Sequence, residues 1–105
     1  MTYDTVLTVL ADPTRRAIFE ALRPGPSSVG RIATQMPVSR PAVSQHLKAL
    51  KEAGLVTDEA RGTARIYAIR PGGLSDLRNW IDGFWGEALD RFRDHAEFVR
   101  DKDVG

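Results

Sequence analysis

The strongest constraint on the fold is a junction near the middle of the chain, where two helical patterns almost meet. Before it, apolar residues keep the i, i+3, i+4, i+7 spacing of one buried helix face: Val29, Ile32, Ala33 and Met36. Pro37 ends this helix, and only Val38 and Ser39 precede the next helical stretch. Two amphipathic helices joined by so short a turn must cross at a steep angle, as in a helix-turn-helix.

The second helix of the pair carries clear start and stop signals. Ser39 is a plausible N-cap, and Pro41 falls in the first turn, where unpaired N–H groups are expected anyway. Gly54 suits a left-handed cap at the end. The side chains expected to point inward are Val43, Leu47 and Leu50.

Two further helices are predicted before this pair. A short helix over residues 3–10 is followed by the stretch ADPTRRAIFEAL, in which Asp12 can cap a helix and Pro13 suits its first turn. The sequence RPGPSS at 23–28 then breaks the chain, and Ser28 can cap the third helix.

After Gly54, the composition changes to that of strands. The segments LVTDEA and ARIYAI flank the turn residues Arg61, Gly62 and Thr63, which predicts a two-stranded hairpin with a basic tip. A last helix is predicted from residue 74 to the high nineties, with a frayed end at RDKDVG. The predicted fold is therefore mainly α with a small β-hairpin, in the order α-α-α-α-β-β-α of a winged helix-turn-helix.

Size and composition narrow the class of protein. The 105 residues predict one domain over 1–105, with 74–99 as a long C-terminal helix within it. Cysteine is absent, which excludes disulfides and thiolate metal sites. No stretch approaches the ~18 apolar residues of a membrane helix and no signal peptide opens the chain, so a soluble cytoplasmic protein is the default expectation.

Charge is distributed unevenly although the net charge is only +1. Residues 31–70 contain seven Lys and Arg and three Asp and Glu, a balance of +4, whereas residues 71–105 have a balance of −3. A basic middle segment favours a polyanion as its partner. Random scatter of charges over a solvated surface is the alternative interpretation.

The outward face of the 39–54 helix is unusual in having small side chains and no acid before Glu52. In a recognition helix, small residues let the backbone approach the bases, and an amide such as Gln45 can pair with adenine bidentately. The side chains that we expect to contact DNA are Ser39, Arg40, Pro41, Ser44, Gln45, His46, Lys48, Arg61, Thr63 and Arg65.

Each of these assignments has a structural alternative. Capping is the favoured main role of Ser39, and Gln45 could simply be solvated. His46 lies beside Leu47 and could be a packed, hydrogen-bonded residue. The basic hairpin tip could be a solvated turn.

Three segments of the chain resemble the ArsR/SmtB family of bacterial winged-helix repressors: LADPTRRAIFEAL, VSRPAVSQHLKALKEAGLV and RGTARIYAI. The resemblance covers roughly residues 5–92. It implies a homodimer, held by the first and last helices, that binds an inverted-repeat operator in double-stranded DNA and represses transcription. The dimer interface expected from this resemblance and from the apolar stripe of the last helix comprises Val6, Leu7, Leu77, Ile81, Phe84, Trp85, Leu89 and Phe92.

The stripe also raises an alternative, because an aromatic cluster could line a ligand pocket or belong to the core of the monomer. Gly83 and Gly86 interrupt it and suggest close packing against another backbone. At helical spacing, an aromatic stripe is more often core or interface than a cofactor site.

The chain departs from metal-sensing members of the family. The third helix carries VGRIATQM where thiolate sensors have a Cys pair, and the last helix offers only His95 among scattered acids. We therefore expect no metal site, no cofactor and no intrinsic metal sensing. No catalytic constellation is present, so we expect no enzyme. The second hypothesis is a winged-helix module that binds a small molecule or a partner protein instead of DNA.

Overall fold

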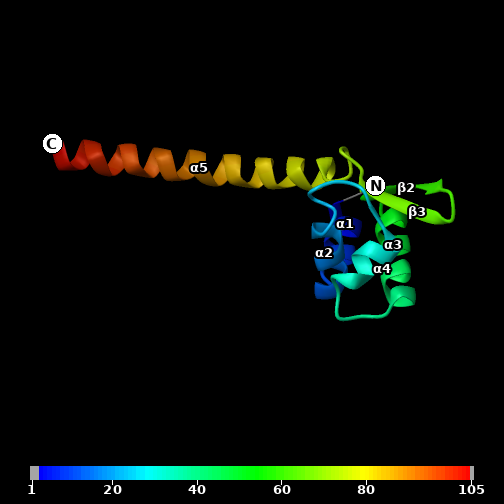
Figure 1. The fold of residues 1–105 in the computed structure, drawn as a ribbon. Coiled ribbons are helices and arrows are strands. Elements are labelled where there is room, and N and C mark those ends of the chain that lie inside the picture. The colour runs from blue at the N-terminus through cyan, green and yellow to red at the C-terminus, as the bar shows by residue number, and fades with distance from the viewer. Residues whose placement is uncertain (1–2, 105) are drawn as a thin grey trace.

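The computed structural model describes the backbone of residues 3–104 and the side chains of residues 3–96 (Figure 1). Among the described residues, four helices precede the β2–β3 hairpin, with the short strand β1 between the second and third of them, and one long helix follows the hairpin. The elements are α1 (Tyr3–Leu10), α2 (Pro13–Glu20), β1 (Ser27–Ser28), α3 (Val29–Thr34), α4 (Arg40–Glu52), β2 (Val56–Arg61), β3 (Ala64–Ile69) and α5 (Ser75–Val104). No helix in this described part is long and apolar enough to cross a bilayer.

Three helix starts follow the predicted caps. The side chain of Asp12 accepts a hydrogen bond from the backbone N–H of Arg15, 3.0 Å away, at the start of α2. Ser28 and Ser39 cap α3 and α4 in the same way. Gly54, with φ of 75°, follows α4 in the left-handed conformation that glycine adopts without strain. These local signals fix where each helix begins and ends.

The sheet differs from the predicted hairpin because it has a third strand. β2 and β3 pair antiparallel around a two-residue turn, and Gly62 takes a φ of 59° there. β1 pairs with the other edge of β3, with Ser27 opposite Tyr67 and Ser28 opposite Ile66. A strand of two residues has no periodicity that a sequence can reveal, and the sequence predicts Ser28 only as a cap.

The core lies where α2, α3 and α4 meet the sheet and the start of the chain. The thirteen buried core residues in the described part of the chain come from the three helices, the sheet, the loops beside them and α1. Leu47 and Leu50 of α4, together with Ile18 of α2, have no exposed surface. Val6 of α1 is only 1% exposed and belongs to this core. Its predicted place in a dimer interface is therefore wrong, because it has no surface to offer a second chain.

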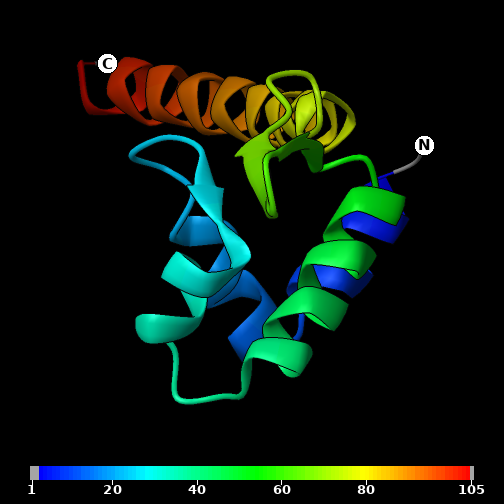
Figure 2. The ribbon, with the colours of Figure 1, turned by 45° about the vertical axis from the view of Figure 1, so that its right-hand side comes forward.

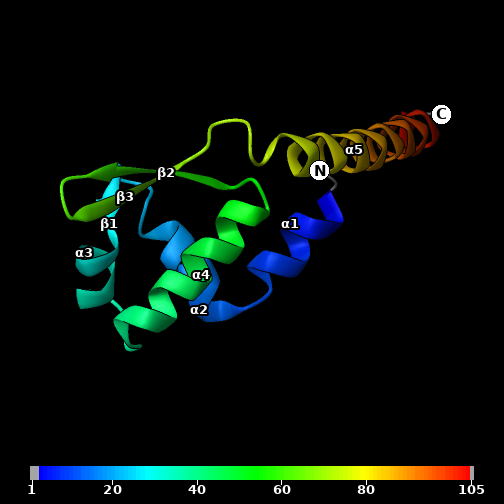
Figure 3. The same cartoon turned by 90° about the vertical axis from the view of Figure 1, so that its right-hand side faces the viewer.

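α5 leaves the core and projects from it (Figures 1 and 3). The molecule measures 73 × 26 × 22 Å, and its radius of gyration of 20.0 Å exceeds the ~13 Å of a compact domain of this length. The helix continues to Val104, beyond the predicted end at 99, and the last residue of RDKDVG lies outside the described residues, so fraying of this tail stays a prediction. From residue 87 to 104 no Pro or Gly interrupts the helix.

The loop between β3 and α5 packs tightly on the end of α4. The backbone N–H of Arg70 donates to the carbonyl of Leu55 at 2.9 Å, and the Arg70 guanidinium donates to the carbonyl of Gly54 at 3.3 Å. A Cβ added to Gly73 would lie 2.6 Å from the Gly54 oxygen, a distance that no side chain tolerates. This contact fixes the point from which α5 departs.

Candidate nucleic-acid interface

α4 presents one face to the core and the other to solvent. α3 and α4 are joined by a short loop and cross at a steep angle (Figure 2). The exposed predicted contacts on or beside α4 are Ser39, Arg40, Pro41, Ser44, Gln45 and Lys48. The described residues of α4 include no acid before Glu52 at the end of the helix. This geometry leaves the start and outer face of α4 open to a polyanion.

Gln45 lies on the exposed part of this face, between the exposed side chains of Pro41, Ser44 and Lys48. Within the part of the chain that the structure describes, no side chain forms a hydrogen bond with its amide. An exposed amide on a helix can donate and accept at the same time, which is what the major-groove edge of adenine requires.

Two residues at the start of α4 also have structural roles. The Ser39 hydroxyl accepts a hydrogen bond from the backbone N–H of Ala42 at 3.3 Å, so it caps the helix as predicted. The Arg40 guanidinium folds back over α3, where a Cβ added to Gly30 would lie 3.6 Å from it. In the free protein the Arg40 side chain therefore lies against α3, although it remains exposed to solvent.

His46 is turned toward α2 and is half-buried. Its Nδ1 accepts a hydrogen bond from Nε of Arg15 at 3.4 Å, and Arg15 also donates to the carbonyl of Val9 at 3.3 Å. The nearby Asp12 carboxyl has a pKa below its ordinary value, chiefly because the backbone N–H of Arg15 donates to it. These contacts match the alternative interpretation of His46 as a packed residue that ties α4 to α2.

The tip of the hairpin, the wing, carries the three predicted residues in exposed positions: Arg61, Thr63 and Arg65. Both arginines are already paired with acids. Arg61 lies 2.9 Å from the carboxylate of Glu59, and Arg65 contacts the carboxylate of Asp58. The sequence predicts a basic tip, and in the structure each of the two arginines pairs with an acid on β2.

Asp58 is a polar residue that sequence reasoning counted only in the charge balance. Its side chain is 7% exposed, and it also accepts from Lys51 of α4 at 2.7 Å. Hydrogen bonds from Lys51 first and Arg65 second hold the pKa of the Asp58 carboxyl below its ordinary value, against the opposing effect of burial. The available signal was the alternation of β2, which turns Asp58 to the same face as the buried Val56.

A second surface runs along α5. Its exposed large apolar side chains are Trp80, Ile81, Phe84, Trp85, Leu89 and Phe92, and Leu7 of α1 is 44% exposed. Leu77 is half-buried against the core of its own chain. Trp80 stacks on Tyr3 with ring centroids 5.1 Å apart, a contact between α1 and α5 that sequence reasoning missed. Gly83 and Gly86 face open space in the single chain.

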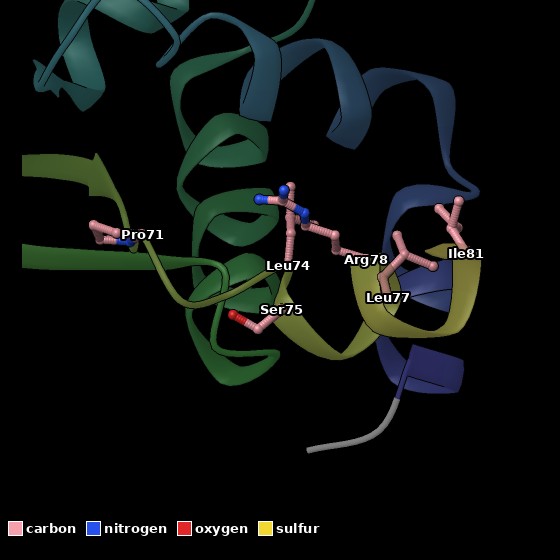
Figure 4. Close-up of a pocket in the computed structure, with 6 residues that line it drawn as sticks. All are labelled: Pro71, Leu74, Ser75, Leu77, Arg78 and Ile81. Atoms are coloured by element: carbon pink, nitrogen blue, oxygen red, sulfur yellow. The ribbon is translucent and has the colours of Figure 1, made fainter. Parts of the chain in front are cut away.

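A shallow apolar pocket of about 380 Å³ lies where α5 begins (Figure 4). It is lined by Pro71, Leu74, Ser75, Leu77, Arg78 and Ile81. Leu77 and Ile81 belong to the predicted dimer interface, so the pocket is continuous with the apolar surface of α5. Arg78 is its one charged lining residue, and its Nε lies 3.7 Å from the carboxylate of Asp82.

His46 and His95 lie on different elements, α4 and α5. Among the described residues, no three His, Cys, Asp or Glu side chains gather where they could hold a metal ion. The absence of metal sensing stays a prediction, because a second chain could complete a site that one chain does not contain.

Known proteins similar to this chain are transcriptional regulators. A helix-turn-helix domain family matches residues 10–59. The chain is 56% identical over 86 residues to the HTH-type transcriptional regulator Rv2034 of Mycobacterium tuberculosis, covering 82% of this chain and 80% of that protein. It is 35% identical over 81 residues to the transcriptional repressor SdpR of Bacillus subtilis, covering 77% and 90%.

The fold of the chain is also similar to that of a solved DNA-binding domain. The solution structure of a homodimeric winged helix-turn-helix DNA-binding domain from Mycobacterium bovis, a possible ArsR-family transcriptional regulator, is similar with a TM-score of 0.65 and 29% identity. The match covers 85% of this chain and 82% of that one. Relatives and fold alike are those of regulators rather than enzymes. The chain therefore belongs to the ArsR/SmtB family of winged helix-turn-helix transcriptional regulators.

Proposed function

We propose that this regulator is a homodimeric repressor that binds an inverted-repeat operator through α4 and the wing, without sensing metal through its own residues. The observation that carries the proposal is the outer face of α4. Gln45 stands there among small exposed side chains, and no acid precedes Glu52. Such a face can approach base edges closely and meets no charge repulsion from the phosphates.

Dimerisation is supported by two independent observations. The exposed stripe of α5 includes Phe84, Trp85 and Leu89, each more than half exposed in the single chain. An apolar surface of that length usually marks an interaction site. The similar domain from Mycobacterium bovis is homodimeric. A two-fold dimer would present two copies of α4 to successive turns of the major groove.

Repression, rather than activation, is supported by the relationship to SdpR, which is itself a transcriptional repressor. A dimer that occupies an operator can block transcription without any further domain. The proposal therefore needs only DNA binding by the two copies of α4, together with phosphate contacts from the wings.

The salt dependence of DNA binding tests this proposal. The protein would be titrated by fluorescence anisotropy against DNA from upstream of its own gene, and against random duplex, over a series of salt concentrations. Each phosphate contact contributes about −0.9 to the slope of log affinity against log salt. Arg61→Ala should flatten the slope by about one unit and leave sequence preference unchanged.

Arg91→Ala is the matched control, because it removes the same charge from exposed α5. It should leave the slope as it is. An unchanged salt slope in Arg61→Ala would show that Arg61 at the wing tip does not contact the DNA phosphates. A wild-type chain that binds neither DNA would favour the second hypothesis, a winged helix that binds a ligand or a partner protein.

A further inference from the structure

The charged cluster formed by Lys51, Asp58 and Arg65 joins the recognition helix to the wing, and we name it the clasp. Lys51 lies in the last turn of α4, Asp58 on β2 and Arg65 on β3. One carboxylate oxygen of Asp58 contacts Lys51 at 2.7 Å, and the other contacts Arg65. A single carboxylate therefore connects three elements.

The burial of the three groups is unequal. The Asp58 side chain is 7% exposed, whereas Lys51 and Arg65 are each 52% exposed. The buried Asp58 carboxylate is thus paired with two cationic side chains that are each about half exposed to solvent. An ammonium has three N–H donors and a guanidinium has five, so both can keep Asp58 and still donate elsewhere.

At the level of Asp58, β3 is held by Tyr67, which is buried in the core and pairs with Ser27 of β1, whereas β2 depends on its own inward side chains. Among the described residues, β2 is an edge strand that pairs with β3 alone, and the inward side chains of β2 are Val56 at its start and Asp58 in its middle. Beyond Asp58 the described residues of β2 are exposed. The clasp is the last inward contact before the turn at Gly62, so it is placed to set the direction of the wing relative to α4.

We propose that Asp58 is a positioning residue for DNA recognition: by bridging Lys51 and Arg65 it orients the wing, and the Arg65 guanidinium with it, toward the DNA that α4 reads. The inference rests on the proposed DNA-binding function. Simple electrostatics predicts the opposite effect of Asp58, because an acidic side chain beside a polyanion should only weaken DNA binding. On that expectation, removing the Asp58 charge would strengthen binding to any DNA.

The variant Asp58→Asn separates the two accounts because they predict opposite signs. Asparagine keeps the size of the side chain but loses the charge that attracts both cations. Lys51 and Arg65 are half exposed, so the change leaves no buried unpaired cation behind. Affinity for the operator should fall by about tenfold, the loss expected for one or two misplaced charge-assisted contacts. Affinity for random duplex should stay equal or rise.

Glu59→Gln is the matched control. Glu59 is the next residue on the same strand and points to the opposite, exposed face, where Arg61 is its one ionic partner among the described side chains. The substitution makes the same change in net charge. It should raise affinity for operator and random duplex together and leave their ratio unchanged. If Asp58→Asn behaves like Glu59→Gln, Asp58 acts only through its charge and the proposal is wrong.

The double variant Lys51→Gln/Asp58→Asn tests whether the clasp acts as a unit. If it does, the double variant binds the operator as weakly as the weaker of the two single variants and no more weakly, because coupled groups give non-additive effects. If Lys51 is an independent phosphate contact and Asp58 only a repelling charge, the two effects add with opposite signs. That additive result would contradict the proposal.

Hydrogen exchange of the free protein gives a readout that needs no DNA. In Asp58→Asn, backbone amides of β2 should exchange faster than in the wild type, while those of α2 and α4 keep their protection. Exchange of β2 at the wild-type rate would overturn the clasp whatever the DNA result. If Asp58→Asn shows the predicted faster exchange but the wild-type protein binds no operator, the proposed function is contradicted and the clasp stays in place.

Discussion

At the scale of single residues, the outer face of α4 combines one side chain that can read a base with others that hold the helix in place. Gln45 is exposed and unengaged within the described structure, whereas His46 beside it is bound to Arg15. Ser39 caps the helix that carries both. On α4, a side chain proposed for base recognition is thus adjacent to one with a structural contact.

Replacing Gln45 with Ala should reduce affinity for the operator by about 1–3 kcal/mol, the usual cost of a lost bidentate base contact. Binding to random duplex should survive, because phosphate contacts supply most of it. Fluorescence anisotropy with both DNAs measures the difference. Asn79→Ala, which removes an exposed amide from α5, is the control and should change neither affinity. An unchanged ratio of operator to random affinity in Gln45→Ala would mean that Gln45 is only solvated.

Metal ions should not release the protein from its operator. Zinc sites favour tetrahedral sets of Cys, His and carboxylate ligands, and this chain has two His and no Cys. Added Zn²⁺, Ni²⁺ or arsenite should leave the anisotropy titration unchanged. Since a dimer could pair two copies of His95, calorimetry with Zn²⁺ is the stricter check. Tight Zn²⁺ binding that lowers DNA affinity and disappears in His95→Ala would refute the prediction.

At the scale of elements, local signals predicted the helices well. Asp12, Ser28 and Ser39 each cap the helix that follows, because an N-cap needs only a short side chain and the next turn of backbone. The apolar spacing of α3 and α4 likewise identified their buried faces. These features depend on neighbours along the chain, so the sequence alone reveals them.

Features that depend on distant segments could not be predicted in the same way. β1 exists because Ser27 and Ser28 meet the free edge of β3. The burial of Val6 and the pairing of Asp58 with Lys51 need the folded positions of several elements. The sequence therefore predicted a set of candidate contacts on α4 and the wing, but it could not predict which of these side chains already contact other residues of the chain.

The junction between β3 and α5 gives a prediction at this scale. Gly73→Ala should destabilise the protein by about 1–3 kcal/mol, the usual cost of overpacking, because its Cβ would lie 2.6 Å from the Gly54 oxygen and 3.0 Å from the Leu55 Cα. Gly72→Ala is the control, since its Cβ would meet only the Ser75 hydroxyl at 3.9 Å. Urea denaturation compares the two. Equal stability of both variants would show that the loop adjusts freely and does not fix the departure of α5.

At the scale of the whole molecule, α5 and the tip of the wing point in opposite directions from the core (Figures 1 and 3). The core needs little of α5 for its own packing, since Phe84, Trp85, Leu89 and Phe92 are all more than half exposed. The similar domain from Mycobacterium bovis is homodimeric. We therefore propose that a second copy of α5 buries this stripe. We propose that α5 forms the dimer interface and that α4 and the wing contact DNA.

The most direct test of this account is the mass and DNA affinity of Phe84→Ala and Trp85→Ala, measured by analytical ultracentrifugation and by anisotropy on a full palindrome and a half-site. Both side chains are more than half exposed in one chain, so each protomer should stay folded. If they are buried in a dimer, truncation costs about 3–5 kcal/mol. Asp82→Ala, an exposed change on the same helix, serves as the control. We expect both variants to be monomers that bind the half-site with normal affinity but no longer bind the full palindrome more tightly. If both variants remain folded dimers with unchanged affinity for the two DNAs, α5 does not form the dimer interface.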